Sequence, residues 1–242
     1  MSNFTTWRSL VDGEEIAVIP DSVVLQYFAT EVSGGSLTWP DDNEVRDMVL
    51  TGDESDNTLS DGLDSLNFDG TSDHGLINLP GDFEESGLTE FSIEFALQFT
   101  HSDRDSLISH RNDGQELRVR PNEREGFDPD AGNVAFVLED TSGNQINCAP
   151  SENPGLNDGN RHDVSIIVED STQNSVTITI DGADQPLSFS SQQNPDNFTT
   201  WTEDCPIAAR SIDGSIDDHF EVDVGAIRLH NKAITEQTIS DY

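Results

Sequence analysis

Short runs in which apolar and polar residues alternate recur along the whole chain, and they constrain its fold more than any other feature. Residues 176–180 read Val-Thr-Ile-Thr-Ile, which predicts a strand with one buried and one exposed face. Asp181-Gly182 follows directly and is typical of a two-residue β-hairpin turn. No amphipathic helical pattern of any length interrupts these runs. The sequence therefore predicts an all-β fold, a two-sheet antiparallel jelly-roll sandwich.

The expected strands extend over most of the chain, and a sandwich of this length is commonly one domain. We expect strands at 23–28, 48–50, 65–68, 76–79, 91–100, 107–110, 116–120, 134–139, 162–169, 175–180, 185–190 and 221–230. Residues 1–22 stand apart, because Trp7 and Leu10 follow a plausible helix start and Pro20 precedes the first strand. This short N-terminal arm either docks on a neighbouring molecule or closes its own sandwich. Residues 23–242 are expected to form the sandwich itself.

The charge of the chain is extreme. It carries 48 acidic and 11 basic residues, a formal net charge of -37, and Lys232 is its single lysine. Such self-repulsion opposes the compact state in dilute buffer, but at 1 M salt the Debye length is only about 3 Å. Acid enrichment with lysine depletion therefore predicts a protein adapted to multimolar salt. A disordered acidic chain would explain the charge but not the regular strand pattern.

The same charge restricts the partners that we expect. A field this negative repels phosphates, so neither nucleic acid nor an anionic membrane surface is an expected partner. The sequence has no apolar stretch of transmembrane length, which argues against membrane insertion. Residues 1–7 lack the basic and apolar regions of a secretory signal peptide. We therefore expect a protein that reaches the outside by another route, such as release inside a virus particle.

Four stretches, in order, resemble the laminin-G/pentraxin-type modules of the concanavalin A-like lectin/glucanase superfamily. They are 66–80 with its Phe-Asp-Gly hairpin, 88–99 with a long alternating strand, 158–182 with its Val-Asp-Gly-like hairpin, and 214–242 with the closing strand. Arg161 and Leu229 depart from the tryptophan and tyrosine usual at those positions, and 100–160 has no strong counterpart. The resemblance implies a concanavalin A-like sandwich and a habit of binding glycans or proteins, often with calcium. A fold of this kind does not by itself identify a ligand.

Glucanases of this superfamily place acidic residues at alternate positions of one strand, as nucleophile and general acid. Glu221 and Asp223 begin such a pattern, but Gly225 occupies the third position. Glu90 and Glu94 share one face of another expected strand, and 48 acids make such a pair unsurprising. No Gly-x-Ser-x-Gly elbow is present, and the six histidines lack metal-ligand spacing. We therefore expect no catalysis.

Candidate ligand contacts are few. Trp39 and Trp201 lie in polar segments, where each could either stack on a sugar or cap the core. His110 and Arg111 begin an arginine-rich region that continues with Arg118, Arg120 and Arg124. In so acidic a chain these arginines either contact an acidic partner, including a neighbouring copy, or form ion pairs within the molecule.

Calcium is a candidate cofactor, because loops rich in carboxylate oxygens provide the ligands that it takes. The candidate ligands are Asp69, Asp73 and Asp217, although in so acidic a chain each acidic loop is first of all a solvated face. Cys148 and Cys205 are the only cysteines, and they either form one disulfide or remain as two buried thiols.

These observations favour a non-catalytic surface module in high salt, outside the cell. The interpretation that we favour is a virion surface protein of a haloarchaeal virus, such as a spike, turret, decoration or fibre subunit. Its partners would then be other virion proteins, further copies of itself, or a cell-surface glycan. A host carbohydrate-binding protein or adhesin is the alternative, followed by a divergent glycoside hydrolase.

Overall fold

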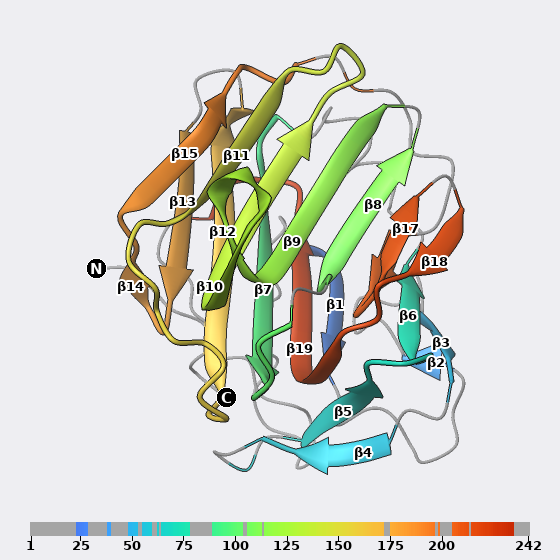
Figure 1. Cartoon of the computed structure of the whole chain (residues 1–242). Coiled ribbons are helices and arrows are strands. Elements are labelled where there is room, and N and C mark those ends of the chain that lie inside the picture. The colour runs from blue at the N-terminus through green and yellow to red at the C-terminus, as the bar shows by residue number, and fades with distance from the viewer. Residues whose placement is uncertain are drawn as a thin grey trace, which may run out of the picture.

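Two β-sheets packed face to face make up the described part of the chain (Figure 1). This computed structural model describes residues 23–28, 38–39, 48–52, 55–59, 62, 64–77, 89–103, 106–112, 114–171, 175–196, 198, 205–212 and 214–234. Apart from the 3-10 turn η2 (Glu125–Phe127) and a 3-10 residue at Ser171, these residues form no helix. The prediction of an all-β, two-sheet sandwich is confirmed. The arm predicted at 1–22 lies outside the described residues.

Sheet A lies at the back in Figure 1. Its strand order is β14 (Ala183–Asp184), β13 (Ser175–Ile180), β12 (His162–Asp170), β7 (Phe91–Gln98), β19 (Glu221–His230), β5 (Asp64–Asp69) and β4 (Ser55–Thr58). The long strand β19 pairs with β5 along its first half and with β1 (Val23–Phe28) along its second half. The pairings within this sheet are antiparallel.

Sheet B lies at the front and presents its outer face to the viewer (Figure 1). Its order is β15 (Leu187–Gln192), β11 (Gln145–Pro150), β10 (Asp128–Glu139), β9 (Gln115–Arg124), β8 (Ile108–Asn112), β16 (Cys205–Ile207), β6 (His74–Ile77), β3 (Met48–Thr51) and β2 (Thr38–Trp39). A further strand, β17 (Arg210–Ile212), runs parallel to β8 and pairs with β18 (Ser215–Asp217).

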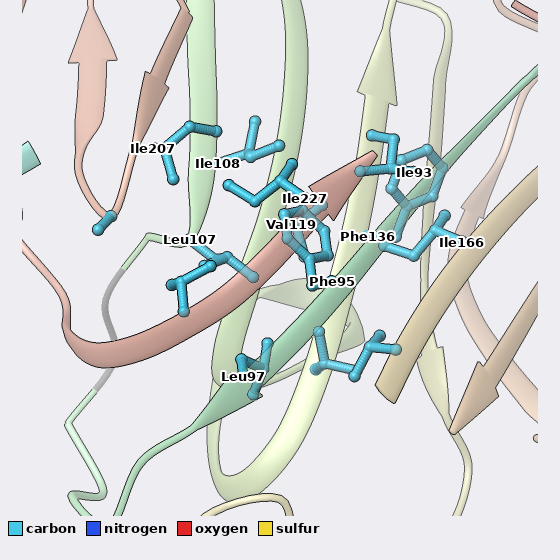
Figure 2. Packing of buried hydrophobic residues seen from close by; sticks show 14 of the residues in the cluster. Ile93, Phe95, Leu97, Leu107, Ile108, Val119, Phe136, Ile166, Ile207 and Ile227 are labelled. Atoms are coloured by element: carbon cyan, nitrogen blue, oxygen red, sulfur yellow. The ribbon is translucent and has the colours of Figure 1, made fainter. Parts of the chain in front are cut away.

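The core forms between the sheets, because alternate residues of each strand point inward. Phe95 and Ile227 from sheet A meet Val119 and Phe136 from sheet B, and all four are fully buried (Figure 2). Each such side chain stabilises the fold by roughly 1.5–3 kcal/mol relative to an exposed one. This apolar layer is what holds together a chain with a net charge of -37.

The turn predicted at Asp181-Gly182 is confirmed. Both residues have positive φ values, 52° and 76°, as a type I′ hairpin requires. The turn joins β13 to β14, and only Gln185 and Pro186 then separate β14 in sheet A from β15 in sheet B. One short connection therefore places the edge strands of both sheets on the same side of the sandwich.

Both cysteines are free and buried, so the disulfide alternative is wrong for this structure. Cys148 lies in β11 and Cys205 in β16, four strand positions apart in sheet B. At a strand spacing of about 4.8 Å this separates them by about 19 Å, whereas a disulfide needs Cα atoms within about 7 Å. Burial raises the pKa of the Cys148 thiol to about 12. The alternative of two buried thiols is the one that the structure contains.

Candidate binding face

The outer face of sheet B carries a row of arginines and glutamates, although sheet B's inner face is apolar. In β9, Leu117 and Val119 belong to the core. Side chains alternate along a strand, so Glu116, Arg118 and Arg120 point outward. Even so, these three are only 4%, 9% and 7% exposed. Most of this charged row is therefore withdrawn from solvent.

Two buried ion pairs account for the centre of the row. Arg118 contacts the Glu116 carboxylate directly, and Arg120 Nη1 lies 3.2 Å from Glu123 Oε2. Removing one partner of a buried pair typically costs about 3–5 kcal/mol, because the other charge is left without compensation. Of the two interpretations of the arginine-rich region, ion pairs within the molecule therefore apply to Arg118 and Arg120.

Arg210 and Arg111 lie at the margin of the same face. Arg210 binds Asp217 through Nε and Nη2, at 2.9 and 3.1 Å, and Asp218 through Nη1 at 2.9 Å. The hydrogen bond to Asp217 raises the pKa of Arg210 further above its usual value. Arg111 is exposed and forms no ion pair with any described residue. It pairs through its backbone with Glu116, whose carboxylate is already occupied by Arg118.

The tip of the β9–β10 hairpin folds over the opposite end of this face (Figure 1). The Gly126 backbone N–H donates to Asn147 Oδ1 at 3.3 Å, which ties the tip to β11. A side chain at Gly126 would meet Ser190 of β15. The Arg124 guanidinium binds Asp128 at 2.9 Å across the base of the tip, in full contact with solvent. The tip therefore acts as a wall at one side of the charged row.

The buried polar atoms of this face that form no hydrogen bond with a described residue include a serine hydroxyl and an asparagine amide nitrogen. These two atoms are Ser109 Oγ and Asn147 Nδ2, whose side chains are 0% and 1% exposed. The backbone register places Ser109 beside Arg118, and Asn147 beside Val137. Leaving such groups unsatisfied costs roughly 1–3 kcal/mol each. The face therefore retains hydrogen-bonding capacity next to its ion pairs.

This arrangement suits recognition better than acid–base catalysis. Glycoside hydrolysis needs two carboxyl groups, one of them held protonated as the acid. Glu116 and Glu123 each contact a guanidinium instead, that of Arg118 and that of Arg120 respectively. Arginine forks and hydroxyl or amide groups are the groups that bind carboxylates and sugars in proteins.

The acidic residues considered for hydrolysis have the following surroundings in the described part of the chain. Asp223 accepts a hydrogen bond from Asn67 at 2.9 Å, and Glu221 is exposed beside Asp69 at the edge of sheet A. Glu90 accepts the backbone N–H of Ala233 at 3.3 Å. These contacts are those of structural carboxylates.

Glu94 instead belongs to a buried ionic cluster on the outer face of sheet A. Its Oε2 atom lies 2.8 Å from His230 Nε2 and 3.4 Å from Arg228 Nη1. All three side chains are 0% exposed. The sequence does not reveal this cluster, because Glu94 and Arg228 are 134 residues apart. The cluster lies at the centre of sheet A, and its three side chains offer no exposed surface to a ligand.

The candidate ligand contacts have different outcomes. His110 is 0% exposed, and it shares the inward face of β8 with Ile108, so it cannot touch a ligand on the outer face. The prediction for His110 is therefore corrected. Trp39 lies in β2, where its side chain is outside the description, and Trp201 lies outside the described residues. Arg111 is the candidate that the structure leaves exposed.

The residues proposed for calcium perform other tasks. Asp69 Oδ1 accepts the backbone N–H groups of Thr71, Ser72 and Asp73 at 2.7–3.1 Å, and these bonds, chiefly that of Ser72, lower the pKa of Asp69. Asp217 is held by Arg210. Among the described residues no group of three or more acids, histidines or cysteines is arranged to hold a metal ion. Calcium binding remains a prediction without a defined ligand set.

Comparison with known proteins identifies the fold alone. No family model matches the sequence, and no curated protein matches it. The structure is similar to the receptor-binding domain of botulinum neurotoxin C/D mosaic serotype, with a TM-score of 0.64 and 14% identity over 90% of this chain. It is equally similar to the binding domain of Paraclostridial Mosquitocidal Protein 1, with a TM-score of 0.64 and 10% identity over 89%. A third similar structure is the binding domain of botulinum neurotoxin DC in complex with rat synaptotagmin II, with a TM-score of 0.61 and 13% identity over 89% of this chain.

This chain spans about half the length of the solved structures that it matches, 50%, 50% and 49% respectively. At such low identity the likeness supports a shared sandwich and carries no residue of any binding site across. No helix in the described part of the chain is long and apolar enough to cross a membrane.

Proposed function

We propose that this chain is a non-catalytic recognition module that binds a carboxylate-bearing glycan or protein on the outer face of sheet B. The observation that carries the proposal is Arg111, an exposed guanidinium without a described ion-pair partner in a chain of net charge -37. Acids outnumber bases by 48 to 11, so an arginine left available on the surface is unusual. The similar structures are binding domains, one of them in complex with SialylT, which agrees with this role.

The ligand would contact Arg111, the exposed guanidinium of this face. Arginine recognises a carboxylate through two parallel N–H donors, which fixes the orientation of the bound group. Ser109 lies two residues before Arg111 on the same face, but its side chain is 0% exposed, so it supports Arg111 from below and is not itself a ligand contact. The buried ion pairs of Arg118 and Arg120 would hold the part of sheet B beneath the ligand rigid.

The test is a binding screen in multimolar KCl, against neutral sugars and sugars that bear carboxylates. Charge-assisted hydrogen bonds contribute about 1.5–3 kcal/mol, so Arg111→Gln should weaken binding by about 10- to 100-fold. Arg124→Gln is the matched control, because Arg124 is also exposed but is already paired with Asp128. Equal affinities for the wild type and Arg111→Gln would refute the assignment of this face.

We further propose that the module is displayed in high salt on a haloarchaeal virus particle, as a spike, turret, decoration or fibre subunit. The acidic composition supports adaptation to high salt, and the structural similarity to receptor-binding domains supports a role in attachment. Mass spectrometry of purified particles, with antibody labelling of intact ones, tests the proposal. Detection of the protein only on host cells would favour the alternative of a host adhesin. Cleavage of a polysaccharide would instead favour the divergent hydrolase.

A further inference from the structure

One flank of the sandwich is almost free of charge. Residues 171–195 contain only Asp181 and Asp184 as charged residues, both at the β13–β14 hairpin. At the chain average of 24% charged residues, a segment of this length would carry about six. This segment supplies the edge strands β13 and β14 of sheet A and β15 of sheet B. The sparse charge therefore coincides with one structural surface, which we call the neutral flank.

The neutral flank exposes backbone that is able to pair. β15 ends the strand order of sheet B, and no described strand pairs with its outer edge. Natural proteins usually protect such an edge with charged side chains or proline, yet residues 187–192 read Leu-Ser-Phe-Ser-Ser-Gln. In the described part of the chain, a bulge in β15 opposite the step from Asn147 to Cys148 interrupts this edge. The regular part of the edge is therefore short, about one pair of hydrogen bonds on either side of the bulge.

Apolar side chains lie at the same flank. Val176 of β13 and Leu187 and Phe189 of β15 pack against the core but remain partly exposed. Threonine and serine residues alternate with them along these two strands, and such side chains are able to hydrogen-bond across paired strands. In Figure 1 β15 and β13 lie together at the left side of the molecule. The flank thus combines an open edge, an apolar margin and neutral hydroxyl groups.

We propose that the neutral flank is a self-association surface, on which two copies of this chain pair about a two-fold axis. Two molecules of charge -37 repel each other across their acidic faces, so they approach most closely where the acids are fewest. A two-fold interface uses the same patch on both subunits, and a neutral patch is compatible with itself. The partner is a second copy, because an acidic or basic partner would find no charge to complement on this flank.

The test uses the full chain in multimolar KCl, with molar mass measured by light scattering and sedimentation over a range of concentrations. The wild type should be a dimer that dissociates on dilution. Ser190→Asp combined with Gln192→Asp should weaken the dimer by at least about tenfold, because like charges then face each other across the axis. Both positions are exposed, so circular dichroism should show the fold unchanged. The matched control is Thr51→Asp with Ser215→Asp, two exposed positions on β3 and β18.

A second measurement locates the contact without adding charge. Spin labels on Ser190→Cys should give a short distance between subunits, and labels on Ser215→Cys a long one, since β18 lies six strand positions from β15, about 29 Å. The native cysteines are buried and should not react. A wild type that is monomeric at every concentration would overturn the proposal. So would a dimer that is weakened equally by the control, or one with the shorter distance at Ser215→Cys. Glycan binding through Arg111 is independent of either result.

Discussion

The substitution Arg228→Met tests whether the buried cluster of sheet A stabilises this fold as an ionic cluster or only as packing. Methionine keeps an unbranched stem and removes the guanidinium. Glu94 then remains fully buried, with His230 Nε2 at 2.8 Å as its remaining described contact and with Oε1 already lacking a partner. Removing one member of a buried ion pair costs about 3–5 kcal/mol. We therefore expect a large loss of stability from a change of one side chain.

The size of the effect can be expressed as a melting temperature. Unfolding entropy is about 2.1 cal/mol/K per residue, which for 242 residues gives about 0.5 kcal/mol/K. A loss of 3–5 kcal/mol should therefore lower the Tm by about 6–10 °C, measured by calorimetry in multimolar KCl. Because the cluster is 0% exposed, the difference from the wild type should change little between 2 and 4 M KCl, at about the same 6–10 °C.

Two control variants separate charge from packing. Arg124→Met removes an exposed arginine, and its Tm should equal that of the wild type, because solvent-exposed pairs contribute little. Glu94→Leu combined with Arg228→Met removes both charges, and should recover most of the lost stability. If Arg228→Met melts within about 2 °C of the wild type, the buried charge does not stabilise the native state. If the double variant is no better than the single one, the loss reflects packing alone.

The remaining predictions concern thiols, acid, calcium and salt. Native protein at pH 8 should not react with a thiol reagent, and unfolded protein should react at both cysteines, because burial raises the pKa of Cys148 to about 12. Hydrogen bonds from Ser72, Thr71 and Asp73 lower the pKa of Asp69 below 3.8. The stability that the charged Asp69 contributes is therefore present above pH 3.8 and is lost as the pH falls further. The Tm difference between the wild type and Asp69→Ala should shrink across that range. Calcium, if bound, should raise the Tm in a concentration-dependent way that a chelator reverses. Dilution below molar KCl should loosen the chain, and a circular-dichroism spectrum unchanged in fresh water would contradict adaptation to salt.

The strand pattern predicts the fold well wherever one face of a strand is buried and the other is exposed. β13 and β19 have the predicted bounds, and the Asp181-Gly182 turn forms as expected. β11 was not predicted, because Gln-Ile-Asn-Cys-Ala-Pro is almost fully buried and therefore lacks clear alternation. The long β9–β10 hairpin was underestimated for a related reason, since Arg118 and Arg120 are polar yet buried. Alternation of apolar and polar residues predicts the buried face of a strand only where the polar side chains are exposed to solvent.

The candidate site could be predicted in part. Glu116 and Arg118 are two residues apart on one predicted strand, so their shared face follows from the sequence, whereas the sequence left open whether Arg118 pairs within the molecule or with a partner. The pairing of Arg210 with Asp217 follows only once the β17–β18 hairpin is known. Glu94 and Arg228 meet through the pairing of β7 with β19, which no local pattern encodes. His110 was misjudged, because its neighbours in sequence do not reveal which face of β8 turns inward.

The distribution of arginine explains how the fold and the surface of this protein are related. Arg118, Arg120, Arg161, Arg210 and Arg228 all bind acidic side chains and are no more than partly exposed. Their positive charge is therefore neutralised by acids inside or at the margin of the fold, and the remaining acids lie at the surface. Such a surface repels copies, nucleic acid and membranes alike unless salt screens it. Two features depart from this rule: Arg111, which is exposed and forms no ion pair with a described residue, and the neutral flank, whose only charged residues are Asp181 and Asp184. Each marks a place where another molecule can approach.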